Sequence, residues 1–195
     1  MKLLYVIPSY NRRDLLLNHV WSILQHRHSN LIQYTVFCYI QGPTGEDIEK
    51  YEEFRRTVGD SVIFKYVPKY ETFICGKMRR DAILMANRCC PNHDVIWWAD
   101  DDMVHTHQNP VLDKLLLGTF QDQEYMTVNL KVAQNGADRI KWKKGFNPDS
   151  GQQFFPTVNM GILFRVSDLH KIMSPDIEKI DSGEDLYPFM KSLIF

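Results

Sequence analysis

A run of five apolar residues that stops at three consecutive aspartates is the feature that most constrains this chain. The segment Val95–Met103 reads V-I-W-W-A-D-D-D-M. Its apolar part has the length of a buried strand, in which Trp97 and Trp98 point to opposite faces and pack in the core. Three neighbouring carboxylates cannot share a core, because each buried charge needs a partner. We therefore expect Asp100–Asp102 where the strand leaves the sheet, which is where ligands bind in open α/β sheets.

Asp100–Asp102 support two interpretations. Their mutual repulsion and hard oxygen atoms predict a site for Mn²⁺ or Mg²⁺, and such a cation usually contacts phosphates as well. The alternative is a solvated acidic turn without a ligand. His105 and His107 follow the triplet, and their spacing leaves a mixed His/Asp metal site open as a further alternative.

Upstream of the aspartates, β-rich runs alternate with segments of helical periodicity. This alternation is typical of βαβ units and a parallel sheet. Right-handed crossovers bring the carboxyl ends of such strands to one edge, so we expect the loops after them to surround one crevice. Asn11 is the expected cap of the first helix. The predicted strands are Leu3–Ile7 (ending at Pro8), Tyr34–Ile40 and Val62–Val67, and the predicted helices are Leu16–Leu24, Glu46–Val58 and Lys77–Arg88.

The second half of the chain has a different pattern. Strand-like runs at Tyr125–Leu130, Arg139–Lys143 and Val158–Arg165 are separated by turns with Gly and Asn, without helices between them. This pattern predicts antiparallel pairing. The expected fold class is therefore α/β: a single Rossmann-like domain over residues 1–195, with a mostly parallel central sheet and a small mixed or antiparallel C-terminal extension.

Composition excludes several classes of protein. The formal net charge is −1, without the basic excess of a protein that binds nucleic acid through its phosphates. No apolar run is long enough for a membrane span, and no signal peptide is recognisable. The four cysteines have no zinc-site spacing, and free thiols are the default in a reducing compartment. We therefore expect a cytoplasmic protein. The oligomeric state is not predicted.

Motifs along nearly the whole chain resemble those of GT-A glycosyltransferases and are similar to the large family 2 of inverting enzymes. The first strand ends in V-I-P-S-Y-N-R, G-K-M-R-R-D-A-I opens the helix before the acidic strand, and A-D-D-D matches the D-x-D element. N-M-G-I-L-F-R and G-E-D, which matches the family's E-D element, complete the series. These motifs are Val6–Arg12, Gly76–Ile83, Ala99–Asp102, Asn159–Arg165 and Gly183–Asp185.

The resemblance implies a donor site made of residues from the first half. Arg79 would lie near the nucleotide, Asp100 would contact the ribose, and Asp102 would bind the metal together with Asp100. Asp101 would lie between them in the same site. Pro8, Tyr10 and Arg12 would line the nucleotide pocket.

The resemblance also implies roles for the second half. Asp185 would be the general base that deprotonates an acceptor hydroxyl, and Glu184 would help to hold it. Residues 1–104 would form the nucleotide-binding half and 105–195 the acceptor-binding half of one GT-A domain. Where many relatives end the second strand in an Asp-rich D-D-G-S motif that reads the base, this chain has Tyr39–Gly42 instead.

The resulting hypothesis is an inverting glycosyltransferase that moves a sugar from a nucleotide-diphosphate donor to a glycan or other hydroxyl acceptor. A UDP-sugar is the first expectation and a GDP-sugar the second. One alternative is a sugar-nucleotide pyrophosphorylase, although the loop from Pro8 to Asn11 lacks the glycines that its phosphate loop would carry. The other alternative is a module that binds nucleotide or glycan without catalysis.

Overall fold

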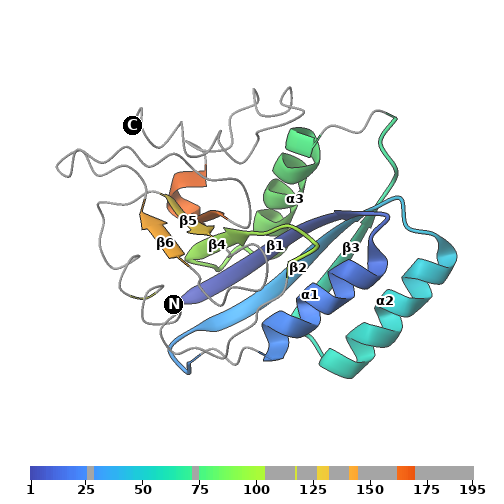
Figure 1. The fold of residues 1–195 in the computed structure, drawn as a ribbon, viewed down its shortest axis with the longest axis horizontal. Helices are drawn as coiled ribbons and strands as arrows, with labels where there is room; N and C mark the ends of the chain where they lie inside the picture. The colour runs from blue at the N-terminus through green and yellow to red at the C-terminus, as the bar shows by residue number, and fades with distance from the viewer. Residues whose placement is uncertain are drawn as a thin grey trace.

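A computed structural model of the protein describes residues 1–25, 29–71, 75–103, 117, 127–131, 141–144 and 162–169. Within these residues, strands and helices alternate through the first half of the chain (Figure 1). The elements are β1 (Lys2–Tyr10), α1 (Arg13–Gln25), β2 (Gln33–Gln41), α2 (Gly45–Val58), β3 (Val62–Val67), α3 (Cys75–Cys89) and β4 (Val95–Trp98). Then follow β5 (Thr127–Lys131), β6 (Lys141–Lys144), β7 (Ile162–Arg165) and a short 3₁₀ helix, Val166–Asp168.

The described strands form one sheet in the order β3-β2-β1-β4-β7-β5-β6. β3, β2, β1 and β4 are parallel neighbours, as the alternation of strands and helices predicts. β7 pairs antiparallel with both β4 and β5, and β5 pairs antiparallel with β6. The predicted fold class, a mostly parallel sheet with an antiparallel extension, is therefore confirmed.

Helices cover both faces of the parallel strands. α1 and α2 lie on one face and α3 lies on the other (Figure 1). Strands covered on both faces are apolar throughout, which explains the continuous burial of Leu3–Ile7 in β1. Trp97 packs in the cluster on the α1 side and Trp98 in the cluster on the α3 side. The prediction that both tryptophans belong to the core is confirmed.

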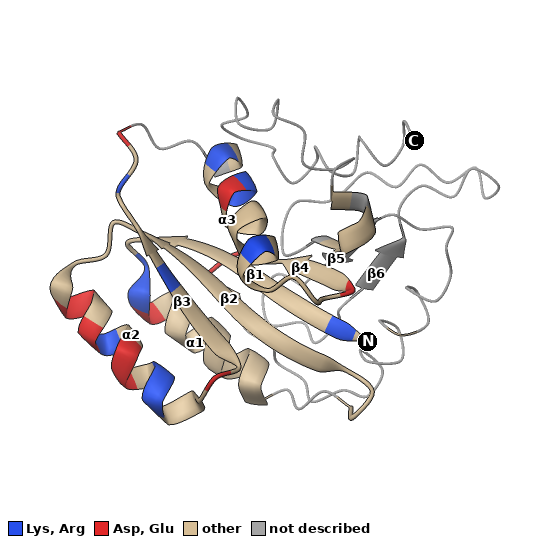
Figure 2. Cartoon of the chain, turned by 180° about the vertical axis from the view of Figure 1, so that it is seen from behind, with Lys and Arg blue, Asp and Glu red and all other residues tan. Residues whose placement is uncertain are grey.

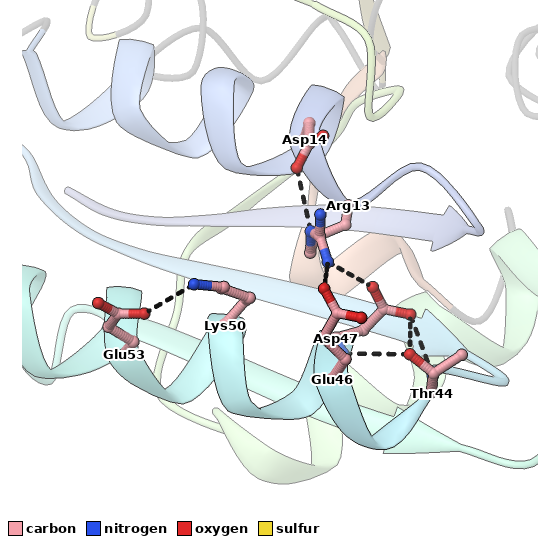
Figure 3. A network of polar contacts seen from close by, with 7 residues as sticks. All are labelled: Arg13, Asp14, Thr44, Glu46, Asp47, Lys50 and Glu53. Carbon is pink, nitrogen blue, oxygen red and sulfur yellow. Dashed lines mark hydrogen bonds and ion pairs between the residues drawn. The ribbon is translucent and has the colours of Figure 1, made fainter.

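The N-terminus of α2 is held by a complete capping box (Figure 3). The Thr44 hydroxyl accepts from the Asp47 N–H at 3.1 Å, and the Asp47 carboxylate accepts from the Thr44 N–H at 3.1 Å. Arg13, at the start of α1, forms ion pairs with Asp14, Glu46 and Asp47 and so joins the first turns of α1 and α2. These contacts fix the relative position of the two loops that follow β1 and β2.

Charged residues are concentrated on the helices and loops, and the central strands carry few of them (Figure 2). Along α2, Lys50 pairs with Glu53 and Arg55 pairs with Glu52.

None of the helices in the described part of the chain has both the length and the apolar content needed to cross a bilayer.

Two predictions about the end of β1 differ from the structure. β1 does not end at Pro8 but continues to Tyr10. Pairing with β4 ends at Val6, whose carbonyl accepts from the Ala99 N–H. Pro8 lies beyond this paired part, so the N–H that proline lacks is not needed for a bond to β4. Asn11 is not the helix cap. It has a φ of 54°, a left-handed conformation that Asn tolerates, and the first helical bond runs from Leu16 to the Arg12 carbonyl.

Candidate functional site

The unequal lengths of β1 and β4 create the site. β4 ends at Trp98, opposite Val6, whereas β1 extends to Tyr10. The aspartates that follow β4 therefore lie beside the last residues of β1. The Ser9 hydroxyl donates to Asp101 Oδ2 at 2.7 Å and ties together positions that are 92 residues apart in the sequence.

A cavity of about 350 Å³ opens at this point. Every predicted site residue in the described part of the chain lines it, and α3 contributes Met78 in addition to Arg79. Glu184, Asp185, His105 and His107 lie outside the described residues. The lining consists of Pro8, Tyr10, Arg12, Met78, Arg79, Asp100, Asp101 and Asp102.

Arg79 is the most firmly held cation of this cavity. It is a buried residue on the first turns of α3, and it pairs with Asp100. Its guanidinium carbon lies 5.0 Å from the centre of the Trp98 ring, which is within cation–π range. The stack and the ion pair together fix the direction in which this side chain points.

Arg12 bridges the other two aspartates. Its Nη1 lies 3.3 Å from Asp101 Oδ1 and 3.1 Å from Asp102 Oδ2. Asp101, whose side chain is 8% exposed, raises the pKa of Arg12 through its negative charge. Burial in turn raises the pKa of Asp101, although hydrogen bonds from Ser9 and Arg12 oppose this change. The loop is thus a compact set of paired charges.

The burial of Asp101 corrects the expectation that the whole triplet stays outside the core. Asp102 is half exposed, as expected, but Asp101 is a buried residue. A buried carboxylate is tolerated here because the Ser9 hydroxyl and the Arg12 guanidinium both donate to it. Sequence reasoning missed Ser9, whose partner is distant in the sequence.

His19 is a second residue that the sequence prediction missed. It lies fully buried on α1, and the backbone of Asp100 and the charge of Asp102 both act on its pKa. Burial lowers its pKa to about 4, so the imidazole is neutral at pH 7. The signal was available, because His19 falls between Leu16 and Val20 on the buried stripe of α1.

Aromatic and charged side chains also surround the end of β2. Lys69 Nζ lies 5.5 Å from the centre of the Tyr10 ring. The hydroxyls of Tyr39 and Tyr70 are 2.8 Å apart, and the Tyr70 hydroxyl donates to Asp81 at 2.6 Å. Where the resemblance implies an Asp-rich motif at the end of the second strand, this chain thus has Tyr39 in a polar network.

The crevice predicted at the strand ends is divided in two. A second cavity of about 350 Å³ lies between the first turns of α1 and α2, and Gln41 and Gly42 line it. Arg12 lines both cavities.

The donor set suits a hard cation that also contacts phosphate. Mg²⁺ is commonly bound through one or two carboxylates together with substrate phosphates. Asp100 and Asp102 are two carboxylates on one cavity, and Asp102 is half exposed. Within the described residues, no group of three or more His, Cys, Asp or Glu side chains could hold a metal ion on its own. The residues fit a cation that is shared with a phosphate ligand.

Comparisons with known proteins concern the fold of the chain. No protein-family model matches the chain, and no curated protein matches it by sequence. Among solved structures, S. aureus TarS residues 1–349 in complex with UDP is similar, with a TM-score of 0.64, 18% identity and coverage of 99% of this chain and 55% of that chain. Another structure of S. aureus TarS has a TM-score of 0.63 and 19% identity, and covers 98% of this chain and 33% of that chain.

A third similar structure is the mannosyltransferase PcManGT from Pyrobaculum calidifontis in complex with GDP-Man and Mn²⁺. It has a TM-score of 0.50 and 13% identity, and covers 64% of this chain and 34% of that chain. The chain thus spans between a third and about half of the length of these proteins. The likeness over nearly the whole chain, together with the sheet order and the acidic turn after β4, shows that the chain has the GT-A fold of nucleotide-sugar glycosyltransferases.

Proposed function

We propose that the protein is a metal-dependent inverting glycosyltransferase, similar to family 2, that transfers a sugar from a nucleotide diphosphate to a hydroxyl acceptor. The observation that carries this proposal is the single cavity in which Arg79 and Arg12 meet Asp100–Asp102 beside the end of β1. Cations there can bind a diphosphate, and carboxylates can accept hydrogen bonds from ribose hydroxyls or bind a metal. The GT-A fold supports the assignment.

The donor would lie along the end of β1. Tyr10 offers a ring for the base, and Pro8 lines the cavity next to it. Arg79 would contact the phosphates from a position fixed by Trp98, and Asp100 would contact the ribose. UDP is the nucleotide in one similar structure and GDP-Man is the donor in another, so we propose a UDP-sugar first and a GDP-sugar second.

Asp100 and Asp102 would hold Mn²⁺ or Mg²⁺. When bound, such an ion neutralises the negative charge that grows on the departing diphosphate. The similar structure with GDP-Man also contains Mn²⁺, which supports this part of the proposal. Arg79 would add a fixed positive charge to the same oxygens, where stabilisation of the transition state lowers the barrier.

The acceptor would be activated by Asp185. Its carboxylate takes the hydroxyl proton while the hydroxyl oxygen attacks the anomeric carbon of the donor. The bond from that carbon to the diphosphate oxygen breaks, and its electron pair leaves with the diphosphate. General base catalysis of this kind contributes about 10²–10⁴-fold. Attack from the side opposite the diphosphate inverts the anomeric centre, and Glu184 would hold Asp185 in place.

Turnover of nucleotide sugars by the purified protein tests this proposal. We expect wild type to release UDP from a UDP-sugar in the presence of Mn²⁺, and Asp102→Ala and Asp185→Ala to lose this activity. Asp94→Asn is the matched control, because Asp94 precedes β4 at its opposite end and accepts from the Lys2 N–H. If wild type and the variants bind the nucleotide but none of them turns over the nucleotide sugar, a non-catalytic module is favoured. Release of pyrophosphate from UTP and a sugar phosphate would favour a pyrophosphorylase.

A further inference from the structure

We propose that Arg12 is a built-in counterion of Asp101 and Asp102 that a divalent cation displaces, and that the displaced guanidinium then binds the phosphates of the donor. The part about phosphates rests on the proposed function, whereas the exchange between Arg12 and the cation does not. A single nitrogen of Arg12 lies within 3.3 Å of Asp101 Oδ1 and 3.1 Å of Asp102 Oδ2. This nitrogen therefore lies against Asp102, one of the two carboxylates proposed to bind the cation.

The two aspartates need a positive charge between them. They are adjacent in sequence and would repel each other, and Asp101 is buried. Ser9 holds the second oxygen of Asp101, so this carboxylate cannot turn away from its neighbour without losing a hydrogen bond. Arg12 supplies the compensating charge from the chain itself and keeps the loop folded before a ligand arrives.

The two arginines of the cavity differ in how firmly they are held. The Arg79 side chain is 10% exposed and stacks on Trp98. The Arg12 side chain is 52% exposed and uses only one nitrogen for both contacts, not the two-nitrogen fork that makes arginine pairs strong. Its pair with Asp102 is exposed on both sides, and exposed ion pairs contribute little, so a divalent cation can replace this contact at low cost.

The displaced side chain has room to move. Arg12 lines both the cavity of the acidic triplet and the second cavity between α1 and α2. Its backbone is fixed, because its carbonyl accepts the first bond of α1. Only the side chain has to move, and it remains beside the donor cavity. Binding of the cation and of the phosphates would then be coupled, since each favours the same position of Arg12.

Titration of Mn²⁺ alone, without nucleotide, tests the exchange. We expect Arg12→Gln to bind Mn²⁺ about three- to ten-fold more tightly than wild type, because the competing charge is gone. Arg13→Gln is the matched control. Arg13 is the next residue, but its ion pairs are with Asp14, Glu46 and Asp47, so the affinity for Mn²⁺ should not change. Adding Asp102→Asn to Arg12→Gln should abolish the gain.

UDP binding to the same proteins, with and without Mn²⁺, separates the two proposals. In wild type, Mn²⁺ should strengthen UDP binding, and this coupling should shrink in Arg12→Gln but persist in Arg13→Gln. An Arg12→Gln variant whose affinity for Mn²⁺ is unchanged or weaker overturns the exchange. The same holds if neither wild type nor Arg12→Gln binds Mn²⁺. If UDP still binds in either of these two outcomes, the proposed function stands although the exchange is overturned. If wild type and both variants fail to bind UDP, the proposed donor site is refuted, but the exchange between Arg12 and Mn²⁺ is not.

Discussion

The guanidinium carbon of Arg79 lies 5.0 Å from the centre of the Trp98 ring, and the same side chain pairs with Asp100. Trp98 is the last residue of β4 and Asp100 follows it by two positions. A short stretch of backbone thus supplies both the surface that supports the arginine and the charge that orients it. Arg79 enters the cavity in one orientation before any ligand binds, which reduces the entropy cost of capturing a phosphate.

Arg79→Lys should weaken UDP binding by about ten-fold, because lysine cannot form the planar stack on Trp98 together with a forked contact to phosphate. The positive charge is retained, so the loss of UDP affinity reports on the shape of the guanidinium group and not on its charge. Arg88→Lys, in the last turn of the same helix, is the control and should bind UDP as wild type does. Isothermal titration calorimetry in the presence of Mn²⁺ measures both. Equal affinities in the two variants would contradict a specific role for the arginine fork.

Gly42→Ala should destabilise the protein by about 1–3 kcal/mol. Gly42 has a φ of 58°, and an added Cβ would lie 2.9 Å from Lys69 Cβ. Gly45→Ala is the matched control three residues later. A Cβ at Gly45 would meet nothing within 4 Å, and alanine at the start of α2 should stabilise the protein by about 0.4–1 kcal/mol. Urea denaturation should show that the free energy of unfolding falls in Gly42→Ala and rises in Gly45→Ala. A change in the same direction in both variants would contradict this interpretation of the β2–α2 loop.

Ser9→Ala should lower the free energy of unfolding by about 1–3 kcal/mol, because it removes a hydrogen bond to a buried carboxylate. It should also weaken Mn²⁺ binding, since Ser9 anchors Asp101, which lies between the proposed metal ligands Asp100 and Asp102. Ser22→Ala removes another buried serine, whose hydroxyl donates to the His19 carbonyl at 2.7 Å within α1. That control should change stability by no more than about 1 kcal/mol and leave Mn²⁺ binding unchanged. A wild-type affinity for Mn²⁺ in Ser9→Ala would show that Asp101 needs no anchor.

Stability should fall between pH 6.5 and 4 because of His19. Burial lowers its pKa from 6.5 to about 4. Within that window the unfolded chain binds a proton that the folded protein excludes, so stability decreases as the pH falls and levels off below the folded pKa. The loss should amount to about 2–4 kcal/mol. His19→Asn should reduce the slope of unfolding free energy against pH, whereas His93→Asn, at a partly exposed position, should retain it. An unchanged slope in His19→Asn would exclude His19 as its origin.

The sheet and the position of the acidic turn could be predicted because their signals are local. Apolar runs that end at proline, glycine or aspartate mark the strands, and the alternation with helices implies parallel order. This reasoning also identified Asp100, whereas Arg79 came from the resemblance to family 2, and the structure places both on one cavity.

The pairing of charges within the site could not be predicted, because it depends on contacts between distant segments. Ser9 and Asp101 are 92 positions apart, and only the register of β1 against β4 brings them together. The burial of Asp101 follows from this contact and from Arg12. The loop conformation at Asn11 was mistaken for a cap because Asn favours both helix caps and left-handed turns.

The most direct test of the account is calorimetric titration of UDP and GDP into the wild-type protein with and without Mn²⁺, repeated with Asp100→Asn and with Asp94→Asn. Asp100 lines the cavity after the C-terminal end of β4, whereas Asp94 directly precedes the first residue of this strand. The account predicts that Mn²⁺ strengthens binding of one nucleotide, that Asp100→Asn weakens it by about ten-fold or more, and that Asp94→Asn binds as wild type does. Equal binding by all three proteins, or binding of neither nucleotide, would contradict it.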